Sequence, residues 1–492
     1  MSKDEGLVKL NKVIEEEDVF LKKRRKKLFG NNAENELDYN RFGIALSGGG
    51  IRSATINLGF LKTLNLFDLL RKADYLSTVS GGGYTGSYIQ ATLRNEGDYD
   101  KLFDDEHISY MRSRGEYLVP GSGLLKMWNR FVLLISYFVS LLMSWLSPLI
   151  VLLFFYGISL VIREAPRAEN APHLNFIYEY GVPFVFALFT LHFLSNIFLN
   201  YNLNISSYFS KVESGIISFT LLAFLALFLI GVRIDFIKTD KILLYIAYAV
   251  MLFVLGFFTN PNALSFHRFY RKQLADAFLH FTGDYKNVQL KNLLKPKTAA
   301  NKTDAHLIAP YPLINTCLNL IATNDERFKG TKASDYFLLS PLYCGSKLTN
   351  YVATEETKDY NKMTLPAAVT ISAAAVNPGM GIYSNRLLSL LTTIFNARLG
   401  FWSLNPLKRK NTTPVWWPLY FFRELLLRFG TNNKMLNISD GGHIENLGVY
   451  ELLRRKCRLI IAIDAGADPD FEFTDLENLT IRARNELGLD LR

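Results

Sequence analysis

Four long apolar runs occupy the middle of the chain, and they restrict the fold more than any other feature of the sequence. The runs are almost uncharged and comprise Phe131 to Ile162, Val182 to Leu199, Ser214 to Val232 and Ile242 to Phe258. Because about 20 apolar residues cross the hydrocarbon core of a bilayer as a helix, we predict an inserted bundle of about four transmembrane helices. The first run exceeds the length of one span and contains Pro148, so we expect it to tilt, to kink or to begin along the membrane interface.

The composition of the chain favours a membrane over nucleic acid as its partner. Of its 492 residues 49% are hydrophobic, and the net charge is +10. A basic excess suits either nucleic acid or an anionic membrane surface, and the high apolar content favours the membrane. We therefore expect the lipid bilayer to be a partner and do not expect nucleic acid to be one.

The three cysteines argue against a disulfide framework and against a cysteine-rich metal site. Cys317, Cys344 and Cys457 lie far apart in the sequence and form no C-x-x-C pair. This pattern favours reduced, mostly buried thiols in a cytoplasmic protein. The sequence predicts neither a bound metal nor a cofactor.

The N-terminal stretch, residues 1–40, is dense in charge and lacks the apolar core of a signal peptide. It runs from four acidic residues, Glu15 to Asp18, to six basic residues, Lys22 to Lys27. We interpret it as a charged arm that is solvated and either helical or partly disordered. Electrostatic attachment to anionic lipid is the alternative, at about 1 kcal/mol per basic residue near the surface.

Two units of strand, glycine-rich turn and helix follow the arm. Phe42 to Leu46 leads into Ser47-Gly48-Gly49-Gly50, and Tyr75 to Val79 leads into Ser80-Gly81-Gly82-Gly83. Such units in succession are typical of a largely parallel sheet flanked by helices. We predict that residues 41–130 form the first half of an α/β domain.

The α/β pattern returns after the apolar block. Three segments resemble its pieces, namely Ala367 to Val376, Leu436 to Ser439 with a helix behind it, and Arg458 to Ala465. The apolar block, residues 131–258, is therefore expected to be an insertion within one α/β domain. Residues 259–492 form the second half of that domain.

Three loops carry the residue types that attack on an ester requires, which are a nucleophile at a sharp turn, a base and donors for the developing oxyanion. Ser80 lies between a strand and a glycine-rich helix start, as in a nucleophile elbow. Gly48, Gly49 and Gly50 at a helix N-terminus leave backbone N–H groups free for an anion. Asp440 follows the third predicted strand and supplies a base. Each motif alone has an ordinary interpretation as a turn, but open α/β sheets place their sites at the carboxyl ends of strands.

Together these loops resemble the patatin-like and cytosolic phospholipases. The resemblance implies that Ser80 attacks the acyl ester, that Asp440 acts directly as its base and that Gly48, Gly49 and Gly50 form the oxyanion hole. Arg52 matches the basic residue that follows the family's glycine loop. Ala368 to Pro378 resembles the small-residue strand and loop that precede the active site in this family. Ser265 to Leu274 and Asn396 to Pro406 resemble bacterial members with inserted membrane segments. Ser47, Ser53 and Thr78 depart from the family pattern.

A dyad of serine and aspartate needs an explanation, because a free aspartate with pKa ≈ 3.9 is a weak base at neutral pH. Burial in an apolar acyl pocket raises that value. A triad with His443 is the rival arrangement, since this histidine is the only one beside the three loops. We expect His443 instead to cap the following helix or to form a hydrogen bond within the turn.

The order of the segments along the chain bears on membrane topology. Ser80 precedes the apolar block and Asp440 follows it, so a working site requires an even number of crossings, which four spans satisfy. Basic residues flank the block on both sides and favour a cytoplasmic catalytic domain, although the bias is modest. The sequence therefore predicts an integral membrane protein.

The function implied is a membrane-anchored lipid acyl hydrolase of phospholipase A or lysophospholipase type, with membrane phospholipid as substrate. Two alternatives stay open at this point. One is a non-catalytic membrane protein that binds lipid or a partner, and the other is a regulated effector that degrades membranes in defence.

Overall fold

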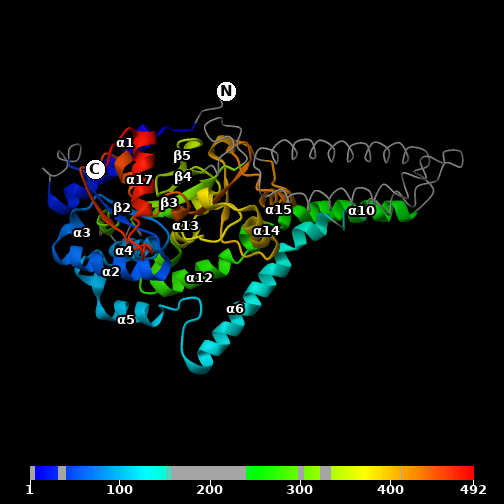
Figure 1. Cartoon of the computed structure of the whole chain (residues 1–492), viewed down its shortest axis with the longest axis horizontal. Coiled ribbons are helices and arrows are strands. Elements are labelled where there is room, and N and C mark those ends of the chain that lie inside the picture. Colours follow the sequence, from blue (N-terminus) through cyan, green and yellow to red (C-terminus); the bar gives the residue numbers. More distant parts are fainter. Residues whose placement is uncertain are drawn as a thin grey trace.

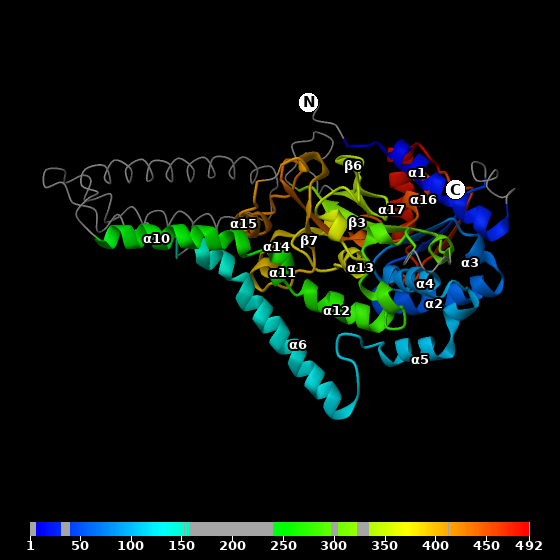
Figure 2. The ribbon, with the colours of Figure 1, turned by 180° about the vertical axis from the view of Figure 1, so that it is seen from behind.

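The computed structural model describes residues 6–30, 40–151, 153, 154, 156, 240–296, 304–321, 334–411 and 413–491. Within these ranges the chain forms an α/β body, from which two apolar helices, α6 (Gly123–Ser144) and α10 (Asp240–Leu255), extend away (Figures 1 and 2). The segments before and after the apolar block pack into the same body, as the predicted insertion requires.

A nine-stranded mixed sheet forms the centre of the body, in the order β6-β5-β4-β3-β2-β1-β9, with β8 pairing β3 and β7 pairing β8. The strands β9, β1, β2 and β3 are parallel, and every other pairing is antiparallel. The parallel sheet expected from the sequence is thus confirmed for these four strands, which form one side of the sheet and end at its edge strand β9, whereas the rest of the sheet is antiparallel. The bounds are β1 Phe42–Leu46, β2 Tyr75–Thr78, β3 Tyr311–Asn319, β4 Ser334–Leu339, β5 Tyr343–Ser346, β6 Asn350–Ala353, β7 Phe401–Leu404, β8 Met435–Asp440 and β9 Leu459–Ile463.

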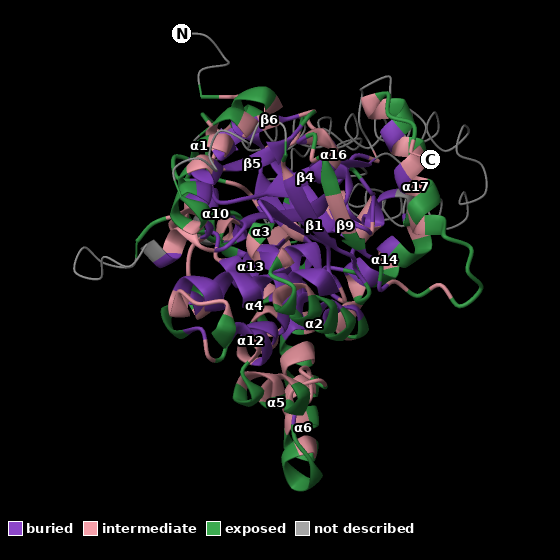
Figure 3. Ribbon diagram, turned by 90° about the vertical axis from the view of Figure 1, so that its left-hand side faces the viewer, coloured by how far each residue is buried: buried purple, intermediate pink, exposed green. Residues whose placement is uncertain are grey.

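Both faces of the sheet are covered, and the alternation of side chains along β3 shows how. Ile314 and Leu318 enter one core with helices α4 (Gly81–Glu96), α12 (His267–Phe278) and α13 (Leu365–Ser372), while Leu313 and Cys317 enter another with α1 (Leu10–Phe29) and α17 (Thr474–Arg482). A strand buried on both faces reads as a nearly continuous apolar run, and all nine residues of β3 are buried. Figure 3 shows this buried centre beneath half-exposed helices.

One predicted segment has a different structure. The strand expected at the start of residues 368–378 is wrong, because the chain forms the helix α13 up to Ser372. The Thr364 side chain accepts a hydrogen bond from the Ala367 N–H and Pro366 lies in the first turn, both of which favour a helix start. A short apolar run does not distinguish a buried strand from a buried helix by its pattern alone.

The N-terminal charged stretch is a helix that packs on the sheet. Within α1, Arg25 forms a salt bridge with Asp74 and Glu17 forms one with Arg455, at 2.6 and 2.7 Å, and all four side chains are largely or fully buried. Arg24 is also buried and donates to the carbonyl oxygens of Ile308 and Ala309. Two of the six basic residues are therefore committed to the fold. The prediction that this stretch is helical is confirmed. The prediction that it is a solvated arm is wrong, because α1 packs against the sheet.

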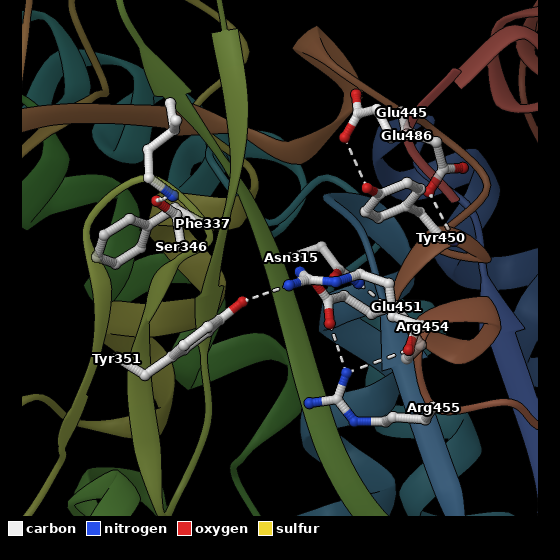
Figure 4. Close-up of polar contacts among 12 residues, drawn as sticks. Asn315, Phe337, Ser346, Tyr351, Glu445, Tyr450, Glu451, Arg454, Arg455 and Glu486 are labelled. Atoms are coloured by element: carbon white, nitrogen blue, oxygen red, sulfur yellow. Dashed lines mark hydrogen bonds and ion pairs between the residues drawn. The ribbon is translucent and has the colours of Figure 1, made fainter. Parts of the chain in front are cut away.

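Helix α16 (Tyr450–Arg454) and the residue after it continue this buried charge network. Arg455 forms ion pairs with both Glu17 and Glu451. Arg454 pairs with Glu451 and donates to the Tyr351 hydroxyl of β6, and Figure 4 shows these contacts of Glu451. Because Glu17, Glu451 and Arg455 are at most 1% exposed, the charges satisfy one another and not the solvent. The network joins the N-terminal helix to the C-terminal part of the chain.

The structure bears on only part of the predicted membrane block. Among the described residues one helix, Gly123–Val151, is long and apolar enough to cross a membrane, and a second apolar helix, Tyr245–Phe258, is shorter. The first begins eight residues before the predicted run. The predicted spans Val182 to Leu199 and Ser214 to Val232 lie outside the described residues, as does the end of the first run. The insertion of four spans therefore stays a prediction.

Candidate active site

Ser80 occupies a strained turn between β2 and α4. Its backbone has φ 49° and ψ −118°, a region that residues with a side chain rarely adopt. The turn also brings backbones into very close approach. A Cβ on Gly81 would lie 2.1 Å from the Gly50 carbonyl oxygen, and one on Gly82 would lie 2.4 Å from that of Leu46. The glycines after Ser80 therefore allow α4 to start against the first glycine loop.

The Ser80 hydroxyl donates a hydrogen bond to Asp440, 360 residues later in the chain. The distance from Oγ to Oδ2 is 2.8 Å, and the other carboxylate oxygen, Oδ1, accepts from the Gly442 N–H at 2.8 Å. Ser80 and Asp440 are 8% and 4% exposed. The structure thus brings together the two residues that the sequence singled out as nucleophile and base.

The pairing along β3 explains how two distant loops meet. One edge of β3 pairs with β4, so β2 and β8 share the other edge, with Thr78 opposite Ile314 and Asp440 opposite Thr316. Strand β2 runs parallel to β3 and β8 runs antiparallel to it, and their carboxyl ends therefore face each other. The expectation that Asp440 follows a strand is confirmed, but this strand approaches from the opposite direction to β1 and β2.

Two residues that sequence reasoning missed hold the turn in place. The Ser80 N–H donates to Ser372 Oγ at 3.0 Å, and that hydroxyl donates to the Asn315 carbonyl oxygen at 2.6 Å. The Asn315 side chain in turn donates to Ser77 Oγ and to the Thr78 carbonyl oxygen. Ser372 lies in the middle of the small-residue segment expected to begin with a strand and is the last residue of α13, so its role depends on a helix that the sequence did not predict.

Burial sets the electrostatics of the dyad. It raises the pKa of Asp440 to about 7, against the smaller opposing effects of the hydrogen bonds from Gly442 and Ser80. A carboxylate with a pKa near neutrality is a far better proton acceptor for a hydroxyl than an ordinary aspartate.

His443 does not take part in a triad. Its Nδ1 lies 2.9 Å from Ser439 Oγ and its Nε2 lies 3.1 Å from the Ala375 carbonyl oxygen, so both ring nitrogens have partners other than Ser80 and Asp440. Burial lowers the pKa of His443 to about 4, which keeps the ring neutral.

The helix expected directly behind Asp440 starts only at Tyr450. The Glu445 carboxylate accepts hydrogen bonds from the N–H groups of Leu447 and Gly448 and so holds an intervening turn.

The glycine loop presents two unengaged donors beside the serine. The Gly48 N–H donates to the Asn446 carbonyl oxygen at 2.9 Å, so this member of the expected oxyanion hole is already occupied. The N–H groups of Gly49 and Gly50 have no acceptor among the described residues. Both glycines have positive φ, at 134° and 63°, and Gly50 starts the helix α2 (Gly50–Leu66) in contact with Gly81. Arg52 is exposed in the first turn of α2.

In the described part of the chain, no group of three or more His, Cys, Asp or Glu side chains is placed to hold a metal ion. The dyad and the backbone donors supply a hydroxyl nucleophile, a base of nearly neutral pKa and a helix N-terminus that favours negative charge.

Comparisons with known proteins give only distant similarity. No family model and no curated protein matches the chain. Among solved structures, human GIVD cytosolic phospholipase A2 matches at 14% identity and a TM-score of 0.44, over 96% of this chain and 49% of that one. The same enzyme in complex with methyl gamma-linolenyl fluorophosphonate matches at 14% identity and a TM-score of 0.35, over 96% and 47%. The chain thus spans about half the length of the solved chains it matches.

Proposed function

We propose that the protein is a membrane-attached serine hydrolase that cleaves acyl esters of lipids, with Ser80 as nucleophile and Asp440 as base. The observation that carries the proposal is the hydrogen bond of 2.8 Å from Ser80 Oγ to Asp440 Oδ2 at a strained, buried turn. Free N–H groups of Gly49 and Gly50 beside that turn supply the third requirement of acyl transfer.

The reaction follows from these positions. Ser80 Oγ attacks the ester carbonyl carbon while Asp440 takes the hydroxyl proton, and the Gly49 and Gly50 N–H groups stabilise the oxyanion that forms. Asp440 then returns the proton to the departing alcohol, which leaves an acyl group on Ser80. Water then attacks this ester while Asp440 takes its proton, and Asp440 passes that proton to Ser80 Oγ as the fatty acid leaves. A pKa of about 7 suits Asp440 to both directions of proton transfer.

A lipid substrate is favoured by the apolar surface of the molecule. On the helix α14 (Arg386–Ile394) and just after it, Leu387, Leu388, Leu391 and Phe395 are 40% to 52% exposed. The neighbouring α6 is attached here, because the Tyr137 hydroxyl donates to the Phe395 carbonyl oxygen and the Trp145 indole donates to that of Ile394. Apolar patches of this kind are typical of membrane or ligand surfaces. Arg52 is the candidate partner for an anionic headgroup at the site.

The test is release of fatty acid from mixed phospholipid vesicles without added metal. Ser80→Ala and Asp440→Asn should each lower the rate by at least about a thousandfold. Ser87→Ala is the matched control, since this buried serine lies on α4, which Ser80 precedes, and its hydroxyl donates to the Tyr84 carbonyl oxygen. A fluorophosphonate probe should label wild type and Ser87→Ala, and not Ser80→Ala.

Activity that survives Ser80→Ala would overturn the proposal. A wild-type protein that neither hydrolyses lipid nor reacts with the probe would favour the non-catalytic lipid-binding alternative.

A further inference from the structure

A second site for lipid is suggested by a groove where the apolar helix α6 meets the α/β domain. The groove has a volume of about 750 Å³ and lies between α6 and α12, with residues of the turn at 286–287 at one end. Pro366, at the start of α13, also lines it, whereas Ser372, at the other end of α13, contacts Ser80. The groove is therefore separated from the catalytic turn by the length of that helix.

One wall of the groove is apolar. It is formed by α6, where Ile135, Val139 and Met143 are 46%, 45% and 41% exposed and follow one another at a spacing of four residues. Residues with this spacing lie on one face of a helix. The Ser140 hydroxyl donates to the Leu264 carbonyl oxygen at 2.9 Å, which fixes this face of α6 against the domain.

The opposite wall is strongly basic. Arg268, Arg271 and Lys272 share one face of α12, while Tyr270 and Leu274 on its other face are buried in the core. Among the described residues that line the groove, Asp276 is the one carboxylate, and it forms a salt bridge with Lys286. Within the described residues, no carboxylate pairs with the other three cations.

Arg271 is half-buried and lies close enough to Arg268 to be repelled by its charge. Burial, and then the charge of Arg268, lower the pKa of Arg271. An anion bound between these side chains would offset both the cost of burying the Arg271 charge and its repulsion by Arg268. Nucleic acid would meet the basic wall but leave the apolar wall of α6 exposed to water. A molecule that carries a phosphate and an acyl chain matches both walls.

We propose that this groove binds an anionic phospholipid of the bilayer, with the phosphate against Arg268, Arg271 and Lys272 and an acyl chain along α6. The lipid reaches the groove by lateral diffusion, because the same helix is the candidate membrane span. This site does not require Ser80 and is separate from the proposed hydrolysis.

The test uses the full chain carrying Ser80→Ala, so that hydrolysis cannot remove the ligand. Native mass spectrometry of the protein in neutral detergent should show phosphatidylglycerol bound at least about tenfold more tightly than phosphatidylcholine with the same chains. Neutralising Arg268, Arg271 and Lys272 to Gln should weaken phosphatidylglycerol binding by at least about tenfold. Neutralising Lys62, Lys358 and Lys362, three exposed lysines outside the groove, is the control with the same change of charge and should have no effect.

A matched pair of substitutions in α6 tests the apolar wall. Val139→Asn should weaken binding, whereas Phe138→Asn, one residue along α6 and outside the groove, should not. Equal phosphatidylglycerol affinity in the two triple variants would overturn the proposal. So would binding of glycerol 3-phosphate as tight as that of the lipid, because the groove would then recognise a free phosphate and not a membrane lipid.

Discussion

A carboxylate that serves as the base for a serine hydroxyl needs a pKa near the working pH, and burial provides this at Asp440. No cation offsets the burial, and only two hydrogen bonds oppose it. The pH dependence of activity should therefore report Asp440 directly. In the proposed mechanism its ionised form is the active one, so activity should be low in acid and rise with pH.

We expect kcat/KM for lipid hydrolysis to rise about tenfold per pH unit below an apparent pKa of about 7 and to level off above it. The measurement is a pH profile on neutral lipid micelles, with the melting temperature recorded at each pH as the control for unfolding. An apparent pKa near that of a free aspartate would show that Asp440 is not the base.

The same burial costs stability once Asp440 is ionised. A carboxyl group whose pKa is raised in the folded state stabilises the fold below its unfolded pKa, and this contribution is lost as pH rises through about 7. Asp440→Asn should therefore raise the melting temperature at about pH 8.5 by several degrees and change it little at about pH 5. Asp470→Asn, at an exposed position, should show no such dependence on pH. Equal melting temperatures of Asp440→Asn and wild type at both pH values would contradict this account.

At the scale of elements, the contact between β1 and the start of α4 depends on glycine. Because a Cβ on Gly82 would lie 2.4 Å from the Leu46 carbonyl oxygen, Gly82→Ala should cost about 2 to 3 kcal/mol of unfolding free energy. Gly59→Ala is the control on the adjacent α2, where a Cβ meets nothing within 4 Å, and should gain about 0.5 to 1 kcal/mol. Urea denaturation measures the unfolding free energy of both variants. An unchanged unfolding free energy in Gly82→Ala would show that α4 moves easily to make room for the added methyl group.

Elements with a local signal could be predicted from the sequence. The strands β1, β2, β8 and β9 are short apolar runs that end in glycine or polar turns, and the two loops with Ser80 and Asp440 follow such runs directly. The direction of β8 has no local signal, since it is set by pairing with β3. The helix α13 escaped prediction for the reason given above, and with it the role of Ser372. Asn315 lies within a buried strand, where its sequence context suggests only a core position.

At the scale of the whole molecule, the buried pair of Glu17 and Arg455 joins the two ends of the described chain. Glu17→Gln should cost about 3 to 5 kcal/mol, because Arg455 would keep its charge in a site without solvent and with only Glu451 as counterion. Glu15→Gln, on the exposed side of α1, should change the unfolding free energy by less than about 0.5 kcal/mol. Thermal unfolding compares the stabilities of these two variants. Equal stabilities would show that the ion pair of Glu17 and Arg455 does not hold α1 on the body.

Attachment to the membrane is also a property of the whole chain. If the apolar block crosses the bilayer, alkaline carbonate should leave the protein in the membrane pellet, since carbonate releases proteins held only by surface charge. A chain lacking residues 131–258 is not a suitable control, because α6 and the end of the block contact the α/β body. A peripheral membrane protein in the same sample serves instead. Release of the full chain into the supernatant would refute the predicted insertion.

The meeting of β2 and β8 at one edge of β3 has a consequence during translation. The ribosome makes Ser80 360 residues before Asp440. At about 5 to 20 residues per second, the nascent chain exists for roughly 20 to 70 s with a nucleophile and no base. In the proposed mechanism, the site therefore has a nucleophile without its base throughout the synthesis of the apolar block, and it is complete only after Asp440 has been made.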